Sequence, residues 1–291
     1  MKKSGLGRVL FLIVLVVMAA GVGMALGMAG ESGEKSTSQE PEPLPEVREI
    51  NESEETEKET PFDMATPIPD EVYTTIVSYE AKKLLQSENG LAKAEITVTM
   101  PQLTMRSAVA GKINEQLLDF YTGAYENGLS AGGEDMEFQQ ETSEEAGEDF
   151  YYRYSYEEGY QVTLFDERYL SILAEGYEYA GGAHGMPFRI PLIFDLETGE
   201  QVKGKSLFAV SEEQFMERKR EAYRELIAQS DEGTYWEDAL SLVEESTDFD
   251  SGYYLSENGV TFYYAPYALA PYAAGFVEAT VPYEKLPLVG E

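Results

Sequence analysis

FYYRYSYEEGYQVTLF at residues 150–165 and YLSILAEGYEY at residues 169–179 are two aromatic-rich runs that decide the fold. Tyr, Phe, Val and Ile favour strands, because their branched or flat side chains pack well on a pleated surface. Only residues 166–168 (DER) separate the runs, and a short polar connection is typical of neighbouring strands that run in opposite directions. The two runs therefore predict adjacent strands of an antiparallel sheet.

Further strands are predicted on both sides of this pair. Residues 94–100 (AEITVTM) alternate apolar and polar side chains, as a half-buried strand does. Asn258 and Gly259 lie between two short apolar runs, which is a strong signal for a tight β-hairpin. The other predicted strands are residues 72–81, 188–196, 253–255, 260–264 and 276–281.

Two amphipathic helices are predicted between the strands. In residues 107–125 an apolar side chain recurs at every fourth position from Val109 to Tyr121. Residues 211–214 (SEEQ) form a capping box that opens a second helix. The acidic, Gly-containing residues 130–149 are predicted to be a loop with at most one helical turn. Strands and helices occur in runs and do not alternate regularly, so the predicted fold class is α+β, an antiparallel sheet with packed helices in two sequential sub-domains.

The N-terminus carries a membrane-targeting pattern. Three basic residues precede residues 9–30, which are uncharged and long enough to cross a bilayer as a helix. Positive charge before this segment and acidic residues after it place the rest of the chain outside the cytoplasm. A cleaved signal peptide is the alternative, with residues 9–20 as its apolar region and residues 27–29 as a weak cleavage site. The chain is therefore predicted to be a single-pass protein of the cell membrane with an extracytoplasmic domain, or a protein secreted after cleavage.

Charge runs and composition divide the rest of the chain. Residues 31–70 are rich in Glu, Ser and Pro and have little apolar surface, so they predict a disordered tether. The predicted organisation is a short basic cytoplasmic tail (1–8), a transmembrane anchor or signal segment (9–30), the tether (31–70), an N-terminal α+β sub-domain (71–180) and a C-terminal α+β sub-domain (181–291). The tail is too short to carry a message, so a signal from the outer domain would need a partner.

The charge and the missing residue types limit the possible functions. The chain has no Cys and a single His, so disulfides, Cys nucleophiles and thiolate metal sites are excluded, and His184 with carboxylates would be a poor zinc site. No cofactor or metal is therefore predicted. Residues 71–291 hold 15 basic and 41 acidic residues, a net charge of −26. This charge repels nucleic acid and attracts cationic partners, or it serves only to keep the domain soluble.

The motifs that would indicate catalysis are weak. Residues 128–132 (GLSAG) match the G-x-S-x-G pattern of α/β-hydrolases, but that pattern needs a strand before it and a helix after it, and here it follows a predicted helix. Asp248 and Asp250 resemble the start of a calcium-binding loop, but the later positions lack the required ligands. The chain is therefore predicted not to be an enzyme, and a hydrolase that uses Ser130 or His184 is the alternative.

Tyrosines gather in two regions and are the candidate ligand-binding residues. Tyr offers a rigid, flat contact area with a polar tip, which suits a sugar or a protein surface. The alternative is a structural role as cross-strand pairs that cover the sheet. His184 lies in a Gly-rich turn, either as a ligand or as a residue tolerated in an unusual backbone conformation. The predicted binding residues are Tyr152, Tyr154, His184, Tyr263, Tyr267 and Tyr272.

Two stretches resemble a bacterial extracytoplasmic family. The first is residues 181–185 (GGAHG), continuing through residues 193–200 (IFDLETGE) to residues 206–208 (SLF). The second is residues 254–275, which end in APYAAG. The family includes the outer domain of the anti-sigma factor RsiV and the non-catalytic half of PdaC-type peptidoglycan deacetylases. The resemblance covers about residues 70–286, in an N-terminal and a more specific C-terminal part.

The resemblance implies an α+β ectodomain that works at the cell wall. For the RsiV branch it implies binding of lysozyme, a strongly basic enzyme that would suit the acidic domain. RsiV-like proteins need a cytoplasmic sigma-binding segment and the deacetylases need a separate metal-dependent domain, so neither sigma release nor deacetylation is expected. The expected function is a non-catalytic binding or sensing module, with lysozyme or another cationic protein as its partner. The alternative is an accessory domain that binds peptidoglycan or another glycan, and no nucleic acid is expected to bind.

Overall fold

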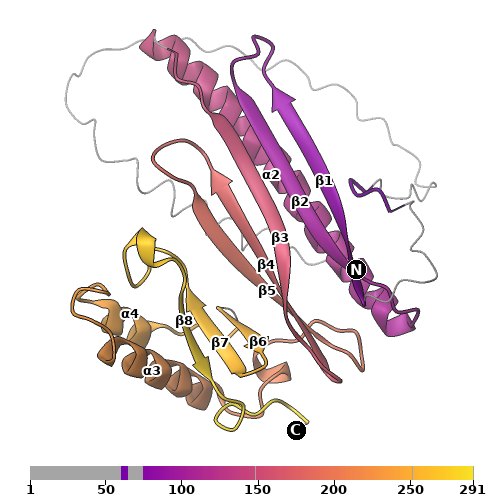
Figure 1. Cartoon of the computed structure of the whole chain (residues 1–291), viewed down its shortest axis with the longest axis vertical. Coiled ribbons are helices and arrows are strands. Elements are labelled where there is room, and N and C mark those ends of the chain that lie inside the picture. The colour runs from indigo at the N-terminus through magenta and orange to yellow at the C-terminus, as the bar shows by residue number, and fades with distance from the viewer. Residues whose placement is uncertain (1–59, 65–74, 148, 251, 291) are drawn as a thin grey trace, which may run out of the picture. The chain divides into compact units, whose positions relative to one another are not determined.

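The structure is a computed structural model that describes residues 60–64, 75–147, 149–250 and 252–290. The predicted cytoplasmic tail, the predicted membrane or signal segment and most of the predicted tether lie outside these residues. Within the described ranges, no helix combines the length and the apolar character that a membrane span requires. Two separate sheets, the first with one helix and the second with two, make up most of this part of the chain (Figure 1).

A five-stranded sheet forms the first sub-domain, with the strands in the order in which they occur along the chain. The strands are β1 (Ile76–Gln86), β2 (Lys93–Leu103), β3 (Arg153–Phe165), β4 (Tyr169–Tyr179) and β5 (Met186–Asp195). The two aromatic runs form β3 and β4, which pair antiparallel as predicted. Every second residue of β2 is buried up to Met100, so one face of this strand is covered and the other is open.

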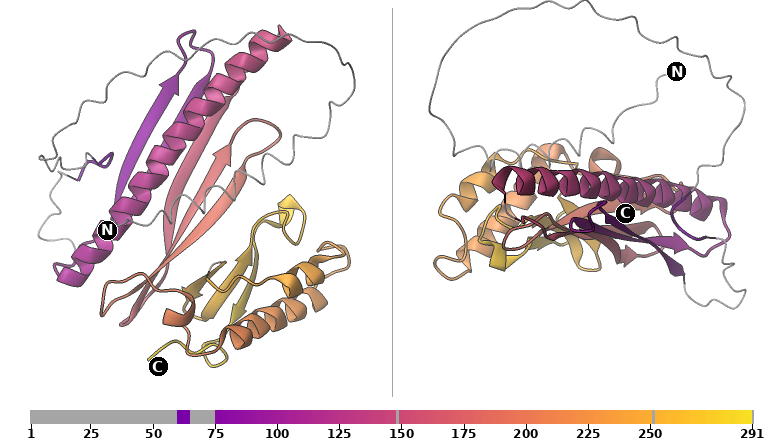
Figure 2. Two further views of the ribbon diagram at one scale, coloured as in Figure 1. Left: turned by 180° about the vertical axis from the view of Figure 1, so that it is seen from behind. Right: turned by 90° about the horizontal axis from the view of Figure 1, so that it is seen from above.

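The sheet is mixed, and the prediction of a wholly antiparallel sheet is wrong at one pair of strands. β2 and β3 run parallel, from Lys93 opposite Arg153 to Val98 opposite Glu158, whereas the other neighbours are antiparallel. Parallel neighbours need a connection that carries the chain back along the sheet. The helix α2 (Ala108–Ala146) is that connection, and it lies along one face of the sheet (Figure 2).

α2 is 39 residues long and extends far beyond the predicted helix. The Ser107 side chain caps its start, and Gly147 ends it in the left-handed conformation. The prediction of a loop over residues 130–149 is therefore wrong for most of this range. The buried stripe of the helix continues in small residues, among them Gly128 and Gly132, which a search for apolar side chains does not detect.

A three-stranded antiparallel sheet and two helices form the second sub-domain. The elements are the single 3-10 turns η1 (Gly204–Ser206) and η2 (Tyr272–Ala274), the helices α3 (Glu212–Ala228) and α4 (Ala239–Glu245), and the strands β6 (Tyr253–Ser256), β7 (Gly259–Tyr264) and β8 (Val277–Val281). The predicted hairpin at Asn258 and Gly259 joins β6 to β7, and the predicted capping box opens α3 at Ser211. Phe215 of α3 lies edge-to-face on Phe262 of β7 in the core of this sub-domain.

β5 belongs to the five-stranded sheet and lies beyond residue 180, so the chain passes to the second sheet only after Asp195. Direct contacts join the two sheets. The Leu255 amide of β6 donates a hydrogen bond to the Ser171 hydroxyl of β4 at 3.1 Å. Arg189 of β5 forms a 2.7 Å ion pair with Glu278 of β8. The turn between β4 and β5 also reaches the segment between β7 and β8, and the candidate site lies at this contact.

Candidate functional site

The turn between β4 and β5 presents the single histidine of the chain. Gly181 and Gly182 have positive φ angles of 86° and 84°, which glycine adopts without strain. A Cβ atom at Gly181 would also lie 2.8 Å from the ring of Tyr152. The tight turn therefore depends on glycine, and it leaves His184 exposed at the surface.

His184 is held by two tyrosines of the segment between β7 and β8. Its ring stacks on Tyr272, with the centroids 3.8 Å apart and the ring planes at 19°. Its Nε2 lies 3.0 Å from the Tyr267 hydroxyl, and its Nδ1 lies 2.9 Å from the Gly185 carbonyl oxygen. A carbonyl oxygen only accepts, so Nδ1 carries a proton, and in the neutral imidazole Nε2 accepts a hydrogen bond from Tyr267.

The backbone of one glycine fixes this arrangement. The Tyr272 hydroxyl also donates to the Gly185 carbonyl oxygen at 3.0 Å, and the Gly185 amide donates to the Tyr177 hydroxyl at 2.7 Å. Gly185 is buried, and a Cβ atom there would lie 2.2 Å from the Glu178 carbonyl oxygen. The turn and the β7–β8 segment are thus held together by a set of hydrogen bonds that only glycine allows.

Tyr267 has a φ angle of 70°, the only positive value of a non-glycine residue in the described ranges. A bulky residue in this region costs roughly 1–3 kcal/mol, and such strain is found mostly at functional sites. The Tyr267 carbonyl oxygen accepts a hydrogen bond from the Trp236 Nε1 at 3.1 Å, and the two residues are 48% and 41% exposed. We call the following group the His184 cluster: Tyr177, His184, Trp236, Tyr267 and Tyr272.

The other predicted binding residues lie outside this cluster. Tyr154 is buried beneath α2, with 1% of its surface exposed. Tyr152 and Tyr263 are half-buried, and their hydroxyls donate to the Asp135 carboxylate at 2.7 Å and to the Arg189 carbonyl oxygen at 3.1 Å. These three tyrosines connect elements of the fold. The structure brings together the remaining three predicted residues, which belong to the His184 cluster.

Tyr177 and Trp236 of the cluster did not stand out in the sequence. Tyr177 is one of 21 tyrosines, and nothing in its neighbourhood along the chain separates it from the rest. Trp236 is the single tryptophan, and this rarity was a usable signal, because exposed tryptophan is enriched where proteins bind ligands. Its place beside Tyr267 depends on the fold and not on local sequence.

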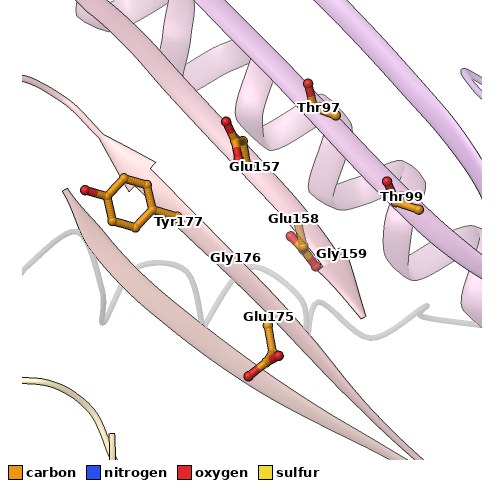
Figure 3. A pocket seen from close by; sticks show the side chains of 8 residues that line it. All are labelled: Thr97, Thr99, Glu157, Glu158, Gly159, Glu175, Gly176 and Tyr177. Atoms are coloured by element: carbon orange, nitrogen blue, oxygen red, sulfur yellow. The ribbon is translucent and has the colours of Figure 1, made fainter. Parts of the chain in front are cut away.

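A second candidate site is a hollow of about 370 Å³ on the five-stranded sheet (Figure 3). The even-numbered residues of β2 are buried towards α2, so Thr97 and Thr99 face the opposite side. Glu157 of β3 is exposed, and Glu175 of β4 forms a 2.7 Å ion pair with Arg189. The residues that line the hollow are Thr97, Thr99, Glu157, Glu158, Gly159, Glu175, Gly176 and Tyr177. The exposed Glu157 carboxylate and the threonine hydroxyls on this open face suit a cationic group.

Glu158 belongs to the wall of this hollow, but it is only 4% exposed. The Tyr156 hydroxyl donates a hydrogen bond to its Oε2, while its Oε1 has no partner within the described residues. Burial raises the pKa of Glu158 to about 7, and the hydrogen bond from Tyr156 offsets only part of this shift. The Tyr121 hydroxyl of α2 is likewise buried without a partner there, and burial, with Glu158 nearby, raises its pKa. A titratable group is therefore enclosed between the sheet and α2.

The G-x-S-x-G motif lies inside α2. It therefore lacks the sharp turn between a strand and a helix that presents the serine of an α/β-hydrolase. Ser130 is exposed, and its hydroxyl donates to Glu134 at 3.2 Å. Gly128 and Gly132 instead face the sheet, where a Cβ atom at Gly132 would lie 2.8 Å from the Cβ atom of Ala94. The glycines thus allow close packing. In the part of the chain that the structure describes, no group of three or more His, Cys, Asp or Glu residues could hold a metal ion.

Comparisons with known families agree with the resemblance seen in the sequence. The family model "Deacetylase PdaC" matches residues 86–187, and the model "Protein of unknown function (DUF3298)" matches residues 201–284. The first match covers β2 to β4, and the second covers the elements from η1 to β8. No curated protein matches the chain.

Two crystal structures of DUF3298-family proteins are similar to this chain. The protein from Bacteroides fragilis is 20% identical, with a TM-score of 0.53 over 72% of this chain and 90% of that chain. The protein from Pseudomonas aeruginosa is 17% identical, with a TM-score of 0.50 over 75% of this chain and 92% of that chain. At these identities the similarity establishes the fold alone. The chain thus carries a PdaC-like domain followed by a DUF3298 domain, the two domains of the family that its motifs resemble.

Proposed function

We propose that the chain is a non-catalytic binding or sensing module that works outside the cytoplasm at the cell wall and binds a basic protein. PdaC and DUF3298 domains form a family that is associated with cell-wall proteins. Residues 9–30 support the proposed location, either as an uncleaved membrane anchor or as a cleaved signal segment. Lysozyme is the first candidate partner, because it is strongly basic.

The acidic hollow on the five-stranded sheet carries this proposal. A Lys or Arg side chain of a partner can place its charge beside Glu157 and donate hydrogen bonds to the hydroxyls of Thr97 and Thr99. Hydrogen bonds between charged groups are the stronger ones, and a strongly acidic domain also speeds the approach of a cation over longer distances. The hollow supplies the contact, and the net charge of −26 supplies the attraction.

Arg189 shows how this face accommodates a cation. Its guanidinium forms 2.7 Å ion pairs with both Glu175 and Glu278 and lies 4.0 Å from the centre of the Phe276 ring. Glu175 is thus already paired with a cation of the chain itself, which it shares with Glu278. Glu157, exposed on the neighbouring strand, is the carboxylate of the hollow that we assign to the partner.

We expect the full-length chain in detergent to bind lysozyme at about 50 mM salt and to lose most of this binding at about 500 mM, because salt screens exposed charges. Reversing the charge in a Glu157→Lys variant should weaken binding at low salt at least tenfold, which corresponds to about 1.4 kcal/mol. Biolayer interferometry with immobilised lysozyme measures both effects.

A Glu141→Lys variant is the matched control. Glu141 is an exposed residue of α2, and its substitution by Lys changes the net charge as much as Glu157→Lys does. It should weaken binding much less than Glu157→Lys. Equal losses in the two variants would assign the attraction to the overall charge and not to the hollow. No association at low salt would rule out lysozyme as the partner.

A further inference from the structure

We propose that the His184 cluster is a carbohydrate-binding site that stacks an uncharged sugar ring of a glycan on Tyr267 and Trp236. The proposal does not rest on a basic partner protein. Both rings are exposed, at 48% and 41%, although side chains of this size usually bury most of their surface. Exposed aromatic rings held in fixed positions suit the flat apolar faces of sugars.

The backbone of Tyr267 adopts a conformation that a side chain makes unfavourable. Its φ angle of 70° is unfavourable for any residue with a side chain, and glycine would adopt it freely. A loop that needed only this turn would be more stable with glycine at this position. The strain is instead retained together with a ring that lies 5.5 Å from Tyr272 and 6.1 Å from His184, centroid to centroid.

The polar groups of the cluster fit the hydroxyl groups of a sugar. When the Tyr267 hydroxyl donates to His184 Nε2, its oxygen still has lone pairs that can accept a hydrogen bond. A sugar hydroxyl can donate to that oxygen while the sugar ring lies on the aromatic face. The stacking on Tyr272 and the hydrogen bond to the Gly185 carbonyl oxygen fix the imidazole of His184. His184 therefore orients the Tyr267 hydroxyl before a ligand binds.

The charge of the cluster favours a neutral ligand over a cation. Within the described residues, its hydrogen bonds join tyrosine hydroxyls, the imidazole, the indole and backbone atoms, and no carboxylate takes part. A site for Lys or Arg would pair the cation with a carboxylate, as the face around Arg189 does. In a chain with 54 acidic residues, such a carboxylate-free group of polar aromatic side chains points to a different kind of ligand.

Trp236 is the single tryptophan of the chain and therefore reports on this site alone. We expect a tetramer of β-1,4-linked N-acetylglucosamine to change the fluorescence of Trp236 in the full-length chain with a saturable dose dependence. Saturation-transfer NMR on the same sample detects the sugar protons directly and does not depend on the indole. A cellulose tetramer, which lacks the N-acetyl groups, shows whether the ring or the N-acetyl group is recognised, and binding of either supports a carbohydrate site.

Tyr267→Gly is the decisive variant, because glycine adopts the same backbone conformation without strain while the ring and its hydroxyl are removed. We expect it to weaken sugar binding at least tenfold, and Tyr267→Phe to weaken it less, because the ring remains. Phe138→Ala is the control, since Phe138 is an aromatic residue of α2 with 55% exposure that lies outside the cluster. The proposal is overturned if neither tetramer gives a signal by either method, or if Tyr267→Gly binds as well as the wild type. Lysozyme binding is measured separately, so the loss of one activity does not decide the other.

Discussion

Between pH 4.5 and about pH 8, the unfolding free energy of the wild-type chain is expected to fall by about 3 kcal/mol relative to that of a Glu158→Gln variant. The cause is the burial of Glu158 between the sheet and α2, which raises its pKa from 4.5 to about 7. Each pKa unit corresponds to about 1.4 kcal/mol of difference between the two protonation states.

The sign follows from where the proton is bound. In the unfolded chain Glu158 releases its proton near pH 4.5, whereas in the folded chain it holds the proton until about pH 7. Between these values the folded state binds more protons, so the unfolding free energy falls as the pH rises and the loss is complete above the folded pKa. Gln does not ionise, and its side-chain oxygen can still accept the hydrogen bond from Tyr156.

Urea unfolding at several pH values between about 5 and about 8 measures this difference. The control is Glu157→Gln, which removes the neighbouring carboxylate from the exposed side of the same strand. It should keep the pH dependence of the wild type, because it leaves the buried carboxyl group of Glu158 in place. If the Glu158→Gln curve ran parallel to the wild-type curve, Glu158 would not be the enclosed titrating group.

Gly132→Ala is expected to lower the unfolding free energy by about 2 kcal/mol, and Gly128→Ala by a similar amount, although Ala is the better helix former. A Cβ atom at Gly132 would lie 2.8 Å from the Cβ atom of Ala94, and one at Gly128 would lie 2.9 Å from the Tyr156 ring and 3.0 Å from Ile96. These atoms belong to buried residues of the sheet and cannot move aside cheaply. The helix would have to move away from the sheet along its length.

The same helix supplies the control for this prediction. A Cβ atom at Gly123 or Gly133 would meet nothing within 4 Å. Gly123→Ala and Gly133→Ala should therefore raise the unfolding free energy by up to about 1 kcal/mol through helix propensity alone. Urea unfolding should show a lower unfolding free energy for Gly128→Ala and Gly132→Ala. It should show a higher one for Gly123→Ala and Gly133→Ala. A gain of stability in all four variants would show that propensity, and not contact with the sheet, decides the effect of glycine in α2.

The strands and the second helix could be predicted because their signals are local. Alternation in β2, the turn at Asn258 and Gly259 and the capping box at Ser211 each depend on a few neighbouring residues. The length of α2 could not be predicted in this way, because its second half packs through glycine and other small residues that give no apolar stripe. The parallel pairing of β2 with β3 depends on that helix, and so it was missed as well.

The candidate site was predictable in part. The tyrosines were identified by type, but their roles depend on which side of the sheet they face and what covers that side. Tyr154 lies buried beneath α2, while Tyr267 is exposed in the segment between β7 and β8. Glu158 follows Tyr154 and Tyr156 on the buried face of β3, so the alternation of the strand predicts that its side chain faces inward. It was not singled out because a buried carboxyl group is recognised only when the layer above the strand is known.

The crossover through α2 also sets the order in which the chain can fold. β3, β4 and β5 are neighbours both along the chain and in the sheet, so each pair can close as a hairpin with little loss of chain entropy. Val98 and Glu158 of the parallel pair must meet across the whole of α2 and its connections. Contacts so distant in sequence form slowly. We therefore expect the hairpin of β1 and β2 to join the sheet late and, until it does, the edge of β3 that pairs with β2 to be open to strands of other molecules.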